Sequence, residues 1–139
     1  MFLGTFYSKL ESKSRLLIPK KLRQDENNWI VTLGLEQNLA LYKLADFNEE
    51  TNKIADLKWN QKINRDYLRL FLNLANEVIA DNLGRILLPD YLLERGELKK
   101  EVVVVGSGKL IEIWDRDNYY RYWQDLEKKR SEIAEGVIV

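Results

Sequence analysis

The 139 residues include 22 basic and 22 acidic side chains and 45% hydrophobic residues, enough to bury a core in one domain or in two small modules. The chain has neither histidine nor cysteine, which excludes Ser-His-Asp and Cys-His catalysis, metal and haem sites built on those residues, and disulfides. No apolar run approaches the roughly 20 residues of a membrane helix, and no signal segment is visible, so we expect a cytoplasmic protein without a cofactor or metal.

The N-terminal segment holds a local excess of positive charge. Residues 1–23 contain six basic side chains and one acidic side chain, a balance of +5, which leaves −5 for the rest of the chain. The basic residues are Lys9, Lys13, Arg15, Lys20, Lys21 and Arg23, and the acidic residue is Glu11. A basic patch of this kind favours nucleic acid as a partner, although a solvated basic face would have the same composition.

The chain contains an internal repeat. Residues 11–22 and residues 81–92 share an acid, an Arg four residues later, three aliphatic residues, a Pro and a Leu, at an offset of 70. Further along, residues 29–34 match residues 101–106, and residues 39–42 match residues 111–114, both at an offset of 72. Neither copy is long enough to bury a core alone, so we expect the two copies to form one composite core.

Each copy predicts the same short elements. Strands are expected at residues 16–18 and 86–88, and a short helix is expected after Pro19 and Pro89, whose fixed φ suits a first helical turn. Gly96 is a plausible end for the second of these helices. Two strands should then pair about Gly34, and two more about Gly106. The run from Val102 to Val105 is apolar on both faces, which is typical of a buried strand.

Helices are predicted between the copies and after the second copy. The linker has an apolar stripe with helical spacing: Ile63, Tyr67, Leu70, Phe71 and Leu74. A shorter helix before it would carry Phe47, Ile54 and Leu57. A C-terminal helix, capped by Asp117, would align Tyr120, Trp123, Leu126, Arg130 and Ile133. This last face could pack on its own domain or on a neighbouring subunit, where aromatic residues are favoured.

The repeated element, Glu11-Ser-Lys-Ser-Arg15 and Asp81-Asn-Leu-Gly-Arg85 followed by aliphatics and Pro, resembles the MraZ family. The resemblance extends from the Met1-Phe2-Leu3-Gly4 start to the 111–114 segment. It implies an α+β fold in which two tandem AbrB-like (SpoVT-type) modules form a composite double-split β-barrel. The expected parts are a first module at 5–47, a helical linker at 48–75, a second module at 76–119, and a C-terminal helix and tail at 120–139.

The resemblance also implies a function. The chain would be a DNA-binding transcriptional regulator, a repressor, of the bacterial cell-division and cell-wall gene cluster, including its own promoter. It would bind short repeated boxes on double-stranded DNA as a ring-shaped homo-oligomer associated with the nucleoid. Linked sites on a ring would compensate, through avidity, for the few phosphate contacts that a neutral subunit can make.

The first copy departs from the family pattern at two positions. Glu11 stands where the family has Asp, and Ser14 stands where it has Gly. Glu is one methylene longer, so an ion pair to Arg15 would have a different geometry. A turn that needs positive φ costs a non-Gly residue on the order of 1 kcal/mol, so either this turn is distorted or position 14 does not need positive φ.

The candidate DNA contacts lie in the two repeated loops. Lys13 suits a phosphate, and Arg15 and Arg85 could also read guanine bidentately. Asn82, in the second loop, is a further candidate. Weaker candidates for phosphate contacts are Lys9, Lys20, Lys21 and Arg23. Glu11 and Asp81 are expected to orient the two Arg side chains, because an acid would repel phosphate. The alternative for each Arg is a purely structural ion pair.

Other classes of function are less well supported. The Ser-Lys neighbours at 8–9 and 12–13 do not make a catalytic dyad, and Gly106-Ser-Gly108-Lys109 is too short for a phosphate-binding loop, so we expect no enzyme and no small-molecule substrate. A non-enzymatic assembly protein, or an AbrB-like antitoxin that binds a protein partner, is the competing interpretation. The basic first loop favours DNA over both.

Overall fold

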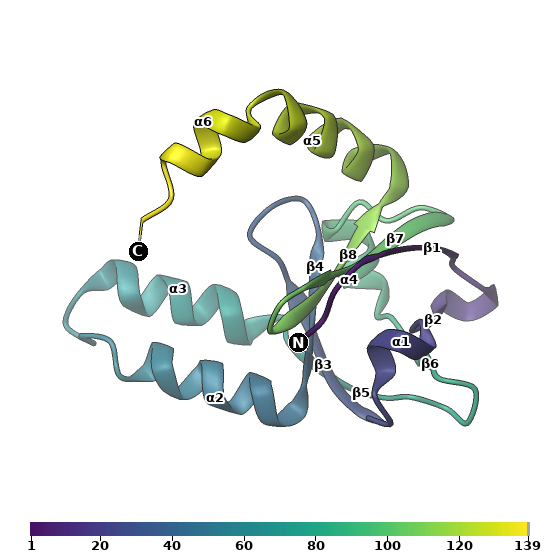
Figure 1. Cartoon of the computed structure of the whole chain (residues 1–139). Helices are drawn as coiled ribbons and strands as arrows, with labels where there is room; N and C mark the ends of the chain where they lie inside the picture. The colour runs from purple at the N-terminus through teal and green to yellow at the C-terminus, as the bar shows by residue number, and fades with distance from the viewer. Residues whose placement is uncertain (139) are drawn as a thin grey trace.

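The computed structural model describes residues 1–138, with the side chains of all of these except Lys13. The fold is mixed α+β, as predicted, and consists of a six-stranded sheet, a two-stranded ribbon and flanking helices (Figure 1). The sheet has the order β1-β7-β8-β4-β3-β5, and β2 and β6 form the ribbon. The strands are β1 (Thr5–Lys9), β2 (Arg15–Leu17), β3 (Asn28–Leu33), β4 (Leu39–Lys43), β5 (Asn76–Ile79), β6 (Arg85–Leu87), β7 (Glu101–Ser107) and β8 (Leu110–Asp115).

The two copies exchange strands with each other. The first strand of each copy pairs with the third strand of the other, β1 with β7 and β5 with β3. The second strands pair in the ribbon, and the fourth strands, β4 and β8, pair at the centre of the sheet. All of these pairings are antiparallel. Because each of them joins a strand of one copy to a strand of the other, neither copy completes its sheet with its own strands.

One main core lies between the sheet and the ribbon. Its fully buried members include equivalent pairs from the two copies, such as Leu16 with Ile86 and Leu22 with Leu92. Leu22 lies on the short helix α1 (Lys20–Arg23), and Leu92 lies on α4 (Asp90–Arg95). Both helices begin directly after the Pro that was expected to start them, and α4 ends at Gly96 as predicted.

Three longer helices, α2 (Leu44–Ala55), α3 (Lys62–Asn73) and α5 (Arg116–Lys128), pack on the opposite face of the sheet. In the first copy, α2 and α3 form a helical hairpin over β3 and β4. In the second copy, α5 packs its first turn on β7 and β8, and α6 (Arg130–Glu135) follows. The two copies anchor these helices alike, because Tyr42 meets Phe47 edge-to-face and Trp114 meets Tyr119 edge-to-face, both at 69°.

The structure corrects the repeat alignment at one strand. Trp29 and Val31 point into the main core, as do Val102 and Val104, so β3 matches β7 at an offset of 73 and not 72. A one-residue slip transfers every side chain of a strand to the opposite face, so the predicted alignment places the wrong residues in the core. Gly34 and Gly106 are therefore not equivalent, since Gly106 lies within β7 and Gly34 follows the end of β3.

Two helix predictions also change. The linker stripe does form a helix, but Phe71 is buried while Ile63, Leu70 and Tyr67 are exposed, because α3 packs on α2 and β3 through a different face. The C-terminal helix is capped by Asp115 and not by Asp117, since the Asp115 carboxylate accepts a hydrogen bond from the Asn118 backbone N–H at 3.1 Å.

Closure into a double-split barrel is not confirmed, because the sheet and the ribbon are separate hydrogen-bonded units in the described residues. Within residues 1–138, no helix is both long and apolar enough to cross a membrane.

Candidate nucleic-acid interface

The β2–β6 ribbon presents equivalent arginines from the two copies on one exposed face. In its register Leu16 pairs with Ile86, Arg15 with Leu87, and Leu17 with Arg85. Leu16 and Ile86 point into the core, so the alternation of strand side chains places both Arg side chains on the opposite face. Arg15 and Arg85 are diagonal neighbours in this register. The ordinary strand spacing and rise per residue then put their Cα atoms about 8 Å apart.

The loops before these arginines share one backbone conformation. The Glu11 N–H donates to the Arg15 carbonyl at 2.8 Å, and the Asp81 N–H donates to the Arg85 carbonyl at 2.9 Å. Ser14 has φ of 61°, and Gly84 has φ of 86°. The first turn therefore keeps a positive φ at this position, although it has no glycine there. Ser14 adopts the left-handed conformation that a glycine would adopt more cheaply.

The loops also bond to each other's strands. The Ile18 N–H donates to the Gly84 carbonyl and the Leu88 N–H donates to the Ser14 carbonyl, both at 3.0 Å. The last residue of each loop therefore accepts a hydrogen bond from the residue that directly follows the ribbon strand of the other copy. The two loops and the ribbon form one structural unit, and displacement of one loop would strain the other.

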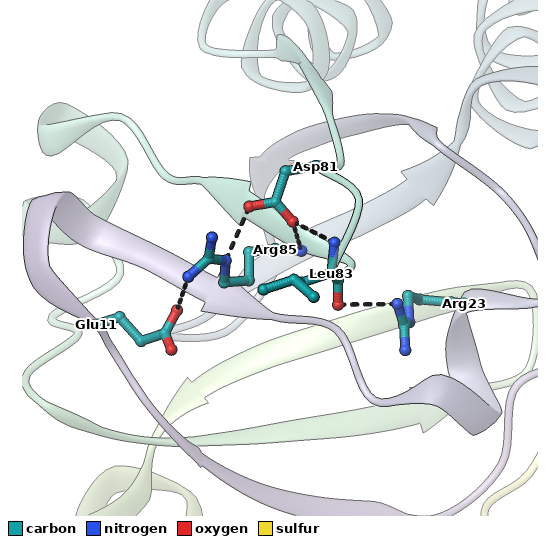
Figure 2. A network of polar contacts seen from close by, with 5 residues as sticks. All are labelled: Glu11, Arg23, Asp81, Leu83 and Arg85. Carbon is teal, nitrogen blue, oxygen red and sulfur yellow. Dashed lines mark hydrogen bonds and ion pairs between the residues drawn. The ribbon is translucent and has the colours of Figure 1, made fainter.

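Asp81 holds the second loop together (Figure 2). One carboxylate oxygen accepts from the backbone N–H groups of Leu83 and Arg85, both at 2.9 Å, and the other accepts from the Arg85 Nε at 2.8 Å. The bond from the Arg85 backbone N–H is the main cause that lowers the pKa of Asp81, with the Arg85 side chain adding to it. The same side-chain contact raises the pKa of Arg85.

Glu11 crosses from the first loop to the second (Figure 2). Its carboxylate lies 3.5 Å from the Arg85 Nη1, so Arg85 meets one carboxylate from each copy. The expected partner of Glu11 was Arg15, but the longer side chain reaches the arginine of the other copy. Neither position nor spacing in the sequence signals this contact, because it depends on the exchange of strands.

Arg23 supports the second loop from the side of α1. Its Nη1 donates to the Leu83 carbonyl at 2.9 Å, as Figure 2 also shows. The guanidinium passes so close to Gly84 that a Cβ at that position would overlap it. Gly84 is thus required for its positive φ and also for this close approach. Sequence reasoning placed Arg23 among possible phosphate contacts, and the structure gives it a bond within the fold.

Arg15 differs from Arg85 in its surroundings. It is exposed, and no hydrogen bond or ion pair of its side chain occurs within the described part of the chain. The side chain of Lys13 lies outside the described part, although its backbone forms the 3-10 turn Ser12–Ser14. Of the two repeated arginines, Arg15 presents its guanidinium to solvent and Arg85 is held by carboxylates.

The other candidate residues lie on β1, on α1 and in the second loop. Lys9 is 3.7 Å from Glu101 across β1 and β7 and is mostly exposed. Lys20 and Lys21 are exposed on α1. Lys20 and Asn82 line one polar hollow between α1 and the second loop. No group of three or more acidic side chains with the geometry of a metal site occurs in residues 1–138.

Comparison with known proteins decides the family. The model of the family described as "MraZ protein, putative antitoxin-like" matches twice, at residues 1–70 and 71–138. The chain belongs to the MraZ family. It is 40% identical to the transcriptional regulator MraZ of Tropheryma whipplei (strain TW08/27) over 138 residues, which cover 99% of this chain and 97% of the relative. The resemblance read from the two repeated loops is thus confirmed.

Proposed function

We propose that this MraZ chain is a DNA-binding transcriptional regulator whose main DNA contact is Arg15, presented on the exposed face of the β2–β6 ribbon. The observation that carries the proposal is the contrast between the two repeated arginines. Arg15 is exposed without a polar partner among the described residues, whereas Arg85 is held by Asp81 and Glu11. The relative from Tropheryma whipplei is named as a transcriptional regulator, and MraZ is a family of regulators and not of enzymes.

The shape of the ribbon suits duplex DNA. The major groove is about 12 Å wide and admits a two-stranded β-ribbon. An arginine on such a ribbon can bind guanine O6 and N7 with two hydrogen bonds, or can bind a phosphate. Arg15 would take one of these roles, and Lys13 would add a phosphate contact from the same loop.

The two copies would contribute unequally to DNA binding. The +5 balance of residues 1–23 surrounds the first loop, so Lys9, Lys20 and Lys21 would add attraction to phosphates. Arg85 would have to leave two carboxylates before it could bind a phosphate, so its contribution would be smaller. Asn82, at the second loop, would be a peripheral contact.

Finer features of the proposal follow from the family resemblance. The regulated genes would be the cell-division and cell-wall cluster, including the protein's own promoter, and the effect would be repression. The modules at 5–47 and 76–119, closed together as a barrel, would be the DNA-reading unit of a ring-shaped homo-oligomer in the cytoplasm and nucleoid. A ring that engages several repeated boxes would gain affinity by avidity, on the order of 10² or more.

Fluorescence anisotropy with a promoter fragment that carries repeated boxes tests the proposal. Wild type should bind this fragment more tightly than a scrambled fragment, and Arg15→Ala should bind it at least tenfold more weakly. Lys109→Ala is the matched control, because Lys109 is an exposed cation in the β7–β8 turn, at the opposite end of β1 from the first loop. If wild type binds neither fragment, DNA binding fails and a protein-binding assembly or antitoxin-like role takes its place.

A further inference from the structure

Glu11 and Asp81 occupy the same position in the two loops, but their carboxylates have different partners. Each residue donates its backbone N–H to the carbonyl of the arginine four residues further along. The Asp81 carboxylate stays in its own loop, where it accepts from the backbone N–H groups of Leu83 and Arg85 and from the Arg85 Nε. The Glu11 carboxylate caps no N–H of its own turn within the described residues and lies 3.5 Å from the Arg85 Nη1.

The length of the side chain accounts for this difference. An Asp carboxylate is short enough to accept hydrogen bonds from N–H groups a few residues further along its own turn, as Asp81 does. Glu11 has one more methylene group, so its carboxylate extends beyond the N–H groups of its turn. The exchange of strands brings the Arg85 guanidinium within its reach, as Figure 2 shows. The carboxylate of the first copy therefore contacts the arginine of the second copy.

Glu11 occupies the edge of Arg85 that Asp81 leaves open. A guanidinium can bind a base or a phosphate with two parallel N–H bonds, either through Nε and one terminal nitrogen or through both terminal nitrogens. Asp81 accepts from Nε at 2.8 Å, and Glu11 lies on Nη1 of the second edge. The pKa of Arg85 is raised first by the Asp81 hydrogen bond and also by the charge of Glu11. Without Glu11, Asp81 would orient Arg85 and leave its second edge open to DNA.

Arg15 is affected in the opposite way. An Asp at position 11 would have an arginine Nε and two backbone N–H groups in front of it, as Asp81 has, because the two loops share one backbone conformation. In the part of the chain that the structure describes, no carboxylate lies within ion-pair distance of Arg15. The glutamate at position 11 therefore leaves Arg15 without the restraint that Asp81 places on Arg85.

We infer that the side chain at position 11 decides which of the two repeated arginines contacts DNA, with Glu11 as a positioning residue that blocks Arg85 and releases Arg15. The inference rests on the proposed function and deepens it, because it names the residue that makes the ribbon asymmetric. The two loops are related by a local two-fold axis through the ribbon, so two equally available arginines would contact the two sides of a box alike. With Arg85 blocked, the ribbon selects a box that is asymmetric about this axis.

Removal of the Glu11 charge gives the first test, by fluorescence anisotropy on a single box. Glu11→Gln should tighten binding about two- to fivefold, since this is the range that an exposed ion pair can hold back. The gain should disappear in the Arg85→Ala background, because Glu11 acts through Arg85. Glu49→Gln is the matched control. It removes an equal charge from an exposed ion pair, 3.6 Å from Lys53 on α2, and should leave binding unchanged.

A shorter acid at the same position gives the second test. In the wild-type background, Arg15→Ala should weaken binding about tenfold or more, and Arg85→Ala about twofold or less. Glu11→Asp should make the two loops alike. In that background Arg85→Ala should weaken binding about tenfold as well, because Arg85 is then held by Asp81 alone. The wild-type protein and the Glu11→Asp variant should thus differ in their dependence on Arg85.

Three results would overturn the inference while wild type still binds the box and the proposed function stands. They are a gain from Glu11→Gln that persists in the Arg85→Ala background, no gain from Glu11→Gln, and an Arg85→Ala change that stays neutral beside Glu11→Asp. Circular dichroism establishes that the variants are folded, and Arg85→Gln, which keeps a polar side chain beside Asp81, repeats each comparison made with Arg85→Ala. If wild type does not bind the box, the proposed function and this inference fall together.

Discussion

Leu16 and Ile86, which occupy the same position in the two copies, pair directly with each other at the centre of the β2–β6 ribbon. Both side chains are fully buried, so the local two-fold relationship between the copies passes through their contact. In the six-stranded sheet, β1 pairs with β7 and β3 pairs with β5, again between copies. The two modules should therefore fold and unfold together.

Leu16→Ala tests this shared core. Removal of a fully buried Leu side chain typically costs about 2–5 kcal/mol, through lost transfer free energy and a residual cavity. Urea unfolding of the variant should show a single transition at a lower midpoint, with both modules affected. Leu3→Ala is the matched control, since Leu3 is 70% exposed and a surface change of this kind stays within about 0.5 kcal/mol. Two separate transitions would contradict the interlocked core.

Ser14→Gly should stabilise the protein. Ser14 has φ of 61°, which costs a residue with a Cβ about 1 kcal/mol, partly offset by the larger entropy of glycine in the unfolded chain. The expected gain is a few tenths of a kcal/mol up to about 1 kcal/mol, measured as a rise in Tm. Ser12→Gly, in the same turn but without positive φ, should lower Tm or leave it unchanged. Equal shifts in the two variants would argue against strain at position 14.

Gly84→Ala should destabilise the second loop for two separable reasons. The φ of 86° strains any residue with a Cβ, and the new Cβ would overlap the Arg23 guanidinium. We expect a loss of about 1–3 kcal/mol, measured by urea unfolding. In the Gly84→Ala, Arg23→Ala double variant the overlap is gone, so the alanine at 84 should cost less than it does beside Arg23. Equal costs in both backgrounds would place the whole effect in φ.

Asp81 makes stability depend on acid pH. Its pKa in the folded state is lowered below 3.8, chiefly by the Arg85 backbone hydrogen bond, so its stabilising contribution is present above pH 3.8 and is lost as pH falls through the lowered pKa. Tm measured from pH 6 to pH 2 should therefore fall more steeply for wild type than for Asp81→Asn. Asp56→Asn, at the exposed end of α2, should follow the wild-type curve. A difference that persists unchanged to pH 2 would contradict this role.

Sequence reasoning predicted the units of this fold better than their arrangement. The repeated acid, Arg and Pro identified both loops and the following short helices, because turn and capping chemistry is local. The offset of β3 against β7 was wrong by one residue, since Ile30 and Val31 are both apolar and the inward side is set by the partner strand. Similarly, the contact between Glu11 and Arg85 arises only from strand exchange, which no local pattern encodes.

The outward stripe on α3 illustrates the same limit. Its apolar spacing predicted the helix correctly, but spacing alone does not tell which side meets its own core. Phe71 is the residue that packs on Phe47, and its neighbour Leu70 therefore points away from the core and is exposed. A helix with apolar residues on two sides is consistent with two partners.

The contrast between Arg15 and Arg85 is tested most directly by the salt dependence of binding to a single box. Each lost phosphate contact flattens the slope of log K against log salt by about 0.9. We expect Arg15→Ala to bind more weakly with a flatter slope, and Arg85→Ala, once its fold has been verified, to keep the wild-type slope. A wild-type slope for Arg15→Ala, or a larger flattening for Arg85→Ala, would contradict the assignment of the DNA contact to the first copy.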